Sequence, residues 1–209
     1  MSLTADKFNQ GMTTDQYIDI IKVNKDPFLQ IHSGVEIPDN VLNYFDSLDQ
    51  AVNLAVFTSD WCGDAMSTTP AILRLADASD KINLRVFNRD DELELTNSFL
   101  PDHRAGTVPV FVAFDENMGE IARFIETARS LVPAIDAMDE MVAQAAASIT
   151  DEAESRQQAR GRRTAHRVSK AAEWGAVILN EFQQTVADGF ALSAESRPAE
   201  GGTEWPPQD

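Results

Sequence analysis

The chain holds one cysteine, Cys62, and the residues around it are those expected near a reactive thiol. An apolar run, residues 52–57, precedes it, and a segment typical of a helix begins at Gly63. A thiol in the first turn of a helix lies beside unpaired backbone N–H groups and the positive end of the helix dipole, and both favour the thiolate. We therefore expect Cys62 to be an accessible nucleophile whose pKa lies below that of a free thiol.

The neighbours of Cys62 limit the chemistry that it can perform. Position 65 is Ala, where a C-x-x-C pair would carry its second thiol. A mixed disulfide formed at Cys62 must therefore be resolved by exchange with a thiol on a second molecule. Trp61 offers a surface on which a partner can pack, while Gly63 and Asp64 shape the helix start. The Asp64 carboxylate also disfavours the thiolate. The alternative is that Cys62 is a helix-start residue of ordinary reactivity.

A second motif, Gly106-Thr107-Val108-Pro109-Val110-Phe111, leads into a strand-like run. Pro109 cannot donate a hydrogen bond to a neighbouring strand, so we expect it at a strand edge. The bond between Val108 and Pro109 is one that can adopt the cis form.

The elements that must position these motifs follow from the apolar pattern. Runs rich in apolar residues predict strands at residues 52–57, 82–87, 110–114 and 120–125. Helices are predicted from Thr13-Thr14 until Pro27, from Pro38, over 63–78 with a kink at Pro70, and over 91–99. The short turn at 115–119 implies an antiparallel hairpin. Strands that alternate with helices and close with a hairpin predict an α/β sandwich with a mixed sheet.

The C-terminal part of the chain has a different composition. Residues 129–191 look helical, with a break near Thr150-Asp151 where an N-cap is available. The stripe Trp174, Ile178 and Phe182 must be buried, either against the sandwich or across a homodimer formed through these helices. We expect residues 1–128 to form the α/β domain with its N-terminal helices, 129–192 a helical extension, and 193–209 a disordered acidic tail.

The overall charge narrows the classes of partner. The chain has 34 acidic and 17 basic residues, a formal net charge of −17, which repels nucleic acid and anionic membranes. An arginine-rich segment, residues 156–170, is better explained as a basic helix lying on an acidic domain or pairing with a second copy. The three histidines are scattered, so no metal site is expected. One cysteine, no signal-peptide pattern and no long apolar run predict a cytoplasmic protein without a membrane span.

Together the two motifs resemble the thioredoxin-like superfamily, and most closely its single-cysteine branch with Trp-Cys-Gly-Asp-Ala. The resemblance rests on residues 61–65, on Pro70, on Arg89-Asp90 and on Thr107-Val108-Pro109. It implies a thioredoxin-like sandwich, a helix kinked at Pro70, and a cis Val108–Pro109 bond that lies against the thiol and binds the partner.

The chain departs from this family at two places. That branch usually carries Arg-Ser-Ile-Pro where this chain has Gly106-Thr107-Val108-Pro109, and Arg104 is the nearby candidate for the missing cation. The dithiol members have a buried acid at the position of Val56. A dithiol cycle is therefore not expected.

These observations predict a monothiol redox protein in which Cys62 forms mixed disulfides with a protein or a small thiol such as glutathione, with no other cofactor. Trp61, Gly63, Asp64, Val108 and Pro109 would form the partner-binding surface. Arg89 would pair with Asp64 or Asp90, or recognise a carboxylate of the small thiol. The alternative from another class is a redox-inert module that uses the same groove to bind a protein.

Overall fold

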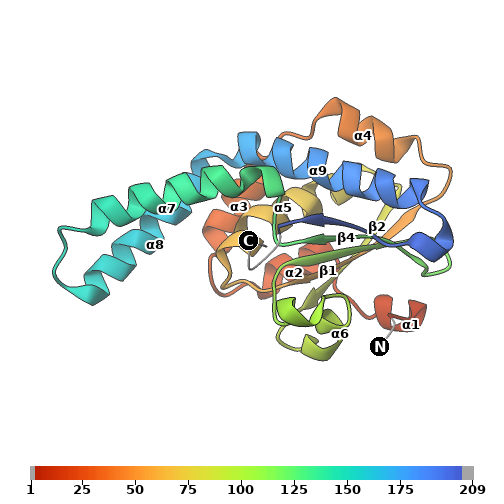
Figure 1. The fold of residues 1–209 in the computed structure, drawn as a ribbon, viewed down its shortest axis with the longest axis horizontal. Coiled ribbons are helices and arrows are strands. Elements are labelled where there is room, and N and C mark those ends of the chain that lie inside the picture. Colours follow the sequence, from red (N-terminus) through yellow and green to blue (C-terminus); the bar gives the residue numbers. More distant parts are fainter. Residues whose placement is uncertain (1–2, 204–209) are drawn as a thin grey trace.

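A computed structural model describes residues 3–203, and these form a layered α/β fold around a five-stranded sheet (Figure 1). The strand order is β2-β1-β3-β4-β5. β1 runs parallel to β2 and antiparallel to β3, while β4 is antiparallel to β3 and parallel to β5. The strands are β1 (Val52–Thr58), β2 (Ile82–Asn88), β3 (Val110–Phe114), β4 (Glu120–Ile125) and β5 (Ala199–Gly202). The predicted mixed sheet and α/β class are confirmed.

The helices cover the two faces of this sheet unequally. α5 and α9, backed by α2, α3 and α4, pack on one face, while α1 and α6 belong to the smaller core on the other. The helices are α1 (Ala5–Phe8), α2 (Thr14–Ile20), α3 (Lys25–Gly34), α4 (Asp39–Asp46), α5 (Gly63–Ala78), α6 (Leu93–Asn97), α7 (Val132–Ala146), α8 (Glu152–Ser169) and α9 (Ala171–Ala191). Short 3-10 turns occupy residues 102–104, 129–131 and 194–196.

Alternation along β1 explains why there are two cores. Leu54 and Val56 point into the larger core, whereas Ala55 and Phe57 point into the smaller one, because successive side chains of a strand face opposite sides. All four are fully buried. A strand that is apolar on both faces must lie in the interior of a sheet whose two faces are both covered. Burial of β1 on both faces therefore fixes where this strand ends, and with it the position of Cys62.

The C-terminal helices do two different things. α9 lies on the sheet, where its predicted apolar stripe is buried, and Phe182 packs against the rings of Phe45, Phe111 and Phe124. α7 and α8 pair with each other and project from the body as a helical arm (Figure 1). The stripe is therefore covered within a single chain, and the homodimer stays a prediction. The predicted break at Asp151 is confirmed, since its side chain caps α8. A second break, at Lys170, was missed.

Two expectations are wrong. Pro27 does not end the helix that begins at Thr14, because that helix, α2, already stops at Ile20. Pro27 lies instead in the first turn of α3, where a backbone N–H would have no hydrogen-bond partner within the helix.

The tail expected to be disordered is ordered as far as residue 203, because β5 adds to the edge of β4. Gly202, with a φ of 87°, lets the backbone approach the Ile125 carbonyl more closely than a side chain would allow. The remainder of that expectation, residues 204–209, lies outside the described residues.

No helix within residues 3–203 is both long and apolar enough to cross a membrane.

Candidate functional site

Cys62 lies where β1 has ended and α5 begins, as its sequence position predicts. It is the N-cap residue of α5, and its side chain is partly exposed. The Sγ atom lies 3.5 Å from the carbonyl oxygen of Val108, to which it can donate a weak hydrogen bond. The Val108–Pro109 bond is cis, as the family resemblance implies, and Pro70 lies inside α5. The structure thus brings together the two sequence motifs, which are 46 residues apart in the chain.

The protonation of Cys62 differs from the sequence-based expectation. Burial raises the pKa of the Cys62 thiol above its ordinary value, and the nearby negative charges of Asp64 and Glu126 raise it further. Backbone N–H groups of Ala65 and Asp64 act in the opposite direction but do not prevail. The expected depression of the pKa is therefore wrong in the isolated chain, because the loss of water outweighs the helix start.

Trp61 forms the exposed rim of the site. Half of its surface is accessible, and its Nε1–H donates to the Asp90 carboxylate over 2.8 Å. The Arg89 guanidinium lies 5.2 Å from the centre of the indole ring and pairs with Asp90 at 3.1 Å. Of the partners considered for Arg89, the structure selects Asp90. This cluster orients an aromatic surface beside the thiol, which suits the packing of a partner chain.

Asp64 has a partner that the sequence analysis missed. Its carboxylate accepts a hydrogen bond of 3.0 Å from the guanidinium of Arg167, which lies on α8 of the arm. The Arg167 side chain is only 8% exposed. A Cβ added to Gly63 would lie 3.4 Å from three atoms of this guanidinium, so Arg167 covers the start of α5. The helical arm therefore reaches the thiol-bearing helix.

A partly buried acid, Glu126, lies beside Pro109. The backbone N–H of Glu126 donates to the Pro109 carbonyl over 2.8 Å. The Glu126 carboxylate lies 3.4 Å from the Arg104 guanidinium and accepts a hydrogen bond from the Thr203 hydroxyl, which follows β5. Burial raises the pKa of Glu126, while the hydrogen bond from Thr203 lowers it. Arg104, proposed as a substitute cation, is thus a partner of this carboxylate.

The position of the family's buried acid is occupied by Val56, which is fully buried in the larger core. Nearby, burial raises the pKa of Tyr17 to about 12; the charges of Asp60 and Cys62 raise it further, and a hydrogen bond with Thr58 lowers it. Tyr17 also lines a cavity of about 380 Å³ with Ser59, Asp60, Asn88 and Asp90. Among the described residues, the carboxyls that raise the pKa of the thiol are Asp64, in the first turn of α5, and Glu126, which directly follows β4.

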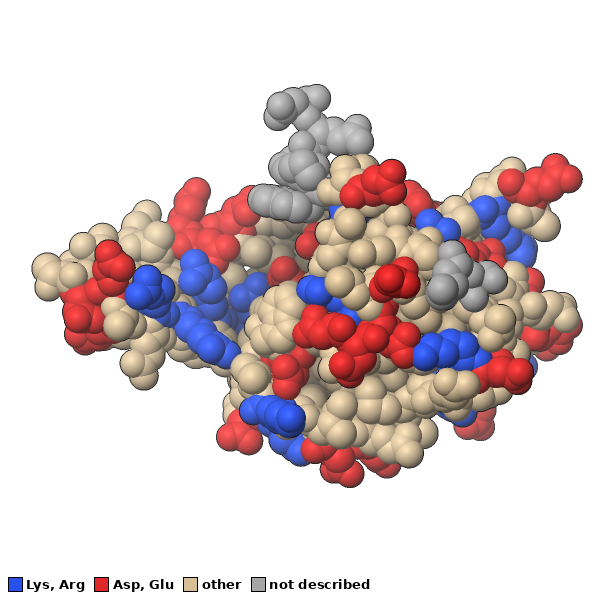
Figure 2. Space-filling model, turned by 90° about the horizontal axis from the view of Figure 1, so that it is seen from below, with Lys and Arg blue, Asp and Glu red and all other residues tan. Residues whose placement is uncertain are grey.

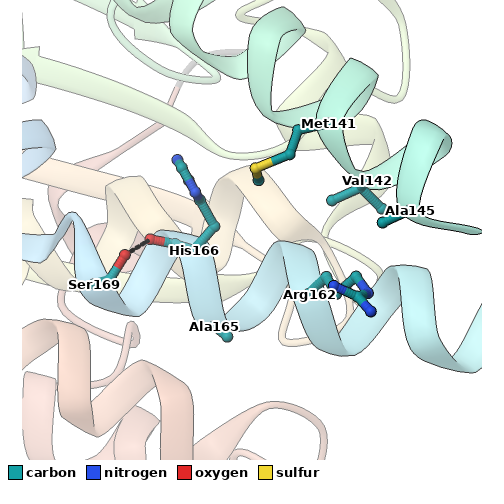
Figure 3. Close-up of a pocket in the computed structure, with 7 residues that line it drawn as sticks. All are labelled: Met141, Val142, Ala145, Arg162, Ala165, His166 and Ser169. Atoms are coloured by element: carbon teal, nitrogen blue, oxygen red, sulfur yellow. Dashed lines mark hydrogen bonds between the residues drawn. The ribbon is translucent and has the colours of Figure 1, made fainter.

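A second hollow lies between the arm helices, away from these motifs in sequence (Figure 3). It has a volume of about 320 Å³ and is lined by apolar residues of α7 and mixed residues of α8: Met141, Val142, Ala145, Arg162, Ala165, His166 and Ser169. The one hydrogen bond drawn there, from the Ser169 hydroxyl to the His166 carbonyl, is internal to α8. No group of three His, Cys, Asp or Glu residues within 3–203 is arranged to hold a metal ion.

Comparison with known structures shows the fold alone. A crystal structure of a protein of unknown function from Pseudomonas aeruginosa matches with a TM-score of 0.56 and 12% identity, over 80% of this chain and 94% of that one. An HIV epitope-scaffold protein matches with a TM-score of 0.53 and 13% identity, over the same shares of the two chains. No curated protein matches.

Comparison of the sequence with models of protein families is more informative. A thioredoxin family model matches residues 11–141, more than half of the chain and a span that includes both Cys62 and Pro109. The chain belongs to the thioredoxin family.

Proposed function

We propose that this protein is a monothiol redox protein whose Cys62 forms mixed disulfides with a protein or a small thiol compound. The observation that carries the proposal is the meeting of Cys62 Sγ with the Val108 carbonyl, 3.5 Å away, at a cis-proline. A partly exposed thiol at a helix start, next to a backbone edge and the exposed Trp61, can receive an extended segment of a partner that carries a disulfide.

The reaction balances without a cofactor. Cys62 loses its proton to solvent, and its sulfur attacks one sulfur of the partner disulfide. A new S–S bond joins Cys62 to that sulfur, the old S–S bond breaks, and the second sulfur leaves as a thiolate. Because the chain has no other cysteine, a second thiol must attack the mixed disulfide, releasing Cys62 and forming a disulfide with the departing group. Glutathione is the small thiol we propose for this step.

The raised pKa of Cys62 shapes this chemistry in two ways. The resting thiol is protonated at neutral pH, so the rate of attack should increase as pH rises. A thiol of high pKa is also a poor leaving group. When the second thiol attacks the partner's sulfur in the mixed disulfide, Cys62 is the leaving group, and its release is therefore slow. We therefore propose a slow thiol carrier rather than a rapid disulfide reductase.

The experiment is a glutathione-dependent reduction assay with a small disulfide, performed on the wild type and on Cys62→Ser. We expect activity that depends on both glutathione and Cys62 and increases from pH 6.5 to pH 8.5. Equal rates for the two proteins would remove the redox proposal.

The second candidate is a redox-inert module that binds a protein through the same surface. The raised pKa of Cys62 and the half-exposed Trp61 favour it. This candidate predicts that Cys62→Ser retains partner binding and that Trp61→Ala loses it. Binding assays on these two variants, with any partner recovered by the wild type, distinguish the two functions.

A further inference from the structure

The arm formed by α7 and α8 reaches the helix start beside Cys62 through the side chain of Arg167. Arginines on α8 recur at positions 156, 160, 163 and 167, a spacing of four, three and four that places them on one face of the helix. Figure 2 shows basic side chains along the arm, at the left of the view, as far as the place where the arm meets the rest of the molecule. The last of the row, Arg167, ends on Asp64.

Burial along this row increases toward Cys62. Arg156 is exposed and pairs with Glu152 of its own helix, and Arg163 pairs with Asp139 of α7 at 2.6 Å with 40% of its side chain exposed. Arg167 is 8% exposed. Ion pairs between exposed side chains contribute little, whereas a buried guanidinium must be compensated where it lies. The Asp64 carboxylate supplies that compensation, two residues from the thiol.

We propose that Arg167 is a positioning residue of the thiol site, which holds the Asp64 carboxylate and partly offsets its charge beside Cys62. The helical arm is then a functional part of the site and does more than cover the domain. The inference rests on the proposed function, because it concerns how the same thiol is made reactive.

The charges around Cys62 give the sign of the effect. Asp64 and Glu126 both disfavour the thiolate, and the buried Tyr17 phenol is neutral at ordinary pH. Arg104 and Thr203 contact Glu126, and Arg167 contacts Asp64. Removing Arg167 leaves the Asp64 charge uncompensated, which should make Cys62 harder to ionise. Removing Asp64 leaves a cation there, which should make Cys62 easier to ionise.

The test is the rate of Cys62 alkylation by iodoacetamide, followed from pH 6 to pH 10 on the full chain. We expect Arg167→Met to slow alkylation at pH 7.5 by about fivefold or more, and Asp64→Asn to accelerate it by a similar factor. The double variant should return to within about twofold of the wild type, because the neutral pair resembles the compensated one. Arg167→Lys, which keeps the charge, should restore most of the rate.

A purely structural role predicts a different pattern. If Arg167 only anchored the arm, its loss would expose Cys62 to water, and both single variants would alkylate faster, because burial is the main cause of the raised pKa. Arg163→Met, at another arginine of α8, is the matched control: it breaks the ion pair with Asp139 of α7 without touching Asp64, and it should leave the profile unchanged. Faster alkylation of Arg167→Met, or an equal effect of Arg163→Met, would overturn the inference.

The same variants separate this inference from the proposed function. Reaction with glutathione disulfide tests the function, and the alkylation profile tests only the ionisation of Cys62. If the profile shifts as expected while no mixed disulfide forms, the inference holds and the redox function fails. If mixed disulfides form but the profile does not respond to Arg167, the function stands and the inference fails.

Discussion

The two sides of Cys62 come from different parts of the chain and are held in different ways. The motif side consists of residues 57–64 and 106–110 and rests on strands β1 and β3, whose residues are buried except for Asn53 of β1. The C-terminal side consists of Arg167 and Thr203, which reach the site from α8 and from the end of β5 and contact its two carboxylates. Packing therefore fixes the sulfur, while polar contacts from distant segments fix the charges around it.

The difference shows how one fold can carry a thiol site with altered chemistry. The motif side places a thiol against a cis-proline, as the thioredoxin family does. The second thiol and the buried acid of the dithiol members are replaced by Ala65 and Val56. In this chain the two carboxylates near the sulfur, Asp64 and Glu126, are contacted by Arg167 and Thr203, which lie outside the family motifs.

The largest effect should come from a glycine where the C-terminal region meets the sheet. A Cβ at Gly189 of α9 would lie 2.2 Å from the carbonyl oxygen of Ile121 in β4, and this is backbone that cannot yield cheaply. We expect Gly189→Val to lower the free energy of unfolding by about 3 kcal/mol or more, measured by urea denaturation. The comparison variant is Gly161→Ala on α8, where an added Cβ meets nothing within 4 Å. It should raise the stability by about 0.5–1 kcal/mol. Similar losses in both variants would mean that the arm is packed as tightly as α9.

The motif side should be sensitive to its buried hydrogen bonds. Thr58 at the end of β1 and Thr69 of α5 share a hydrogen bond of 2.9 Å between hydroxyls, and both residues are fully buried. Thr69→Val should cost about 1–3 kcal/mol of stability, because it leaves a buried hydroxyl without that partner. The double variant Thr58→Val/Thr69→Val should cost less than the sum of the two single changes. Additive losses in thermal or urea unfolding would contradict a direct pair.

Tyr17, which shares a hydrogen bond with Thr58 of the motif side, provides a pH-dependent test of burial there. Burial raises the pKa of Tyr17 to about 12 and also raises that of Tyr44, and the chain has no other tyrosine. The native protein should therefore show less phenolate absorbance at pH 10 than the unfolded protein, in which both tyrosines are half ionised there. Because the folded-state pKa is the higher one, the contribution of Tyr17 to stability is intact below pH 10 and is lost as pH rises through about 12. A native titration centred at pH 10 would show that Tyr17 is exposed.

The smallest effect should come from the outer part of the arm. The ion pair between Arg163 and Asp139 has 40% and 48% of its two side chains exposed. Arg163→Gln should therefore change the free energy of unfolding by at most about 1 kcal/mol, and less in high salt. A larger loss that persists in 1 M salt would mean that this contact holds the arm in place.

The sequence was sufficient for the motif side because its signals are local. A short apolar run ending before Cys62 and a helix start at Gly63 predict β1 and α5, and a proline before an apolar run predicts the edge of β3. The periodic stripe of Trp174, Ile178 and Phe182 predicted a buried helix face, which α9 confirms.

The C-terminal side could not be predicted because its partners are set by tertiary packing. The row of arginines on α8 is visible in the sequence, but no local signal indicates that its last member meets Asp64, 103 residues earlier in the chain. A glycine-rich tail of few apolar residues reads as disordered, yet Gly201 and Gly202 are what allow β5 to pass close to Thr185 and Ile125. The raised pKa of Cys62 likewise depends on burial in the folded chain and on the charge of Glu126, which is far away in sequence.

The most direct test of the central claim is the reaction of the folded protein with glutathione disulfide, followed by intact-protein mass spectrometry at pH 8. We predict a single glutathione adduct at Cys62 that forms without denaturant and is removed by excess reduced glutathione. The rate should increase with pH as the thiol ionises. An adduct that forms only after unfolding in urea would contradict the account, because it would show that the fold shields Cys62 instead of presenting it to a partner.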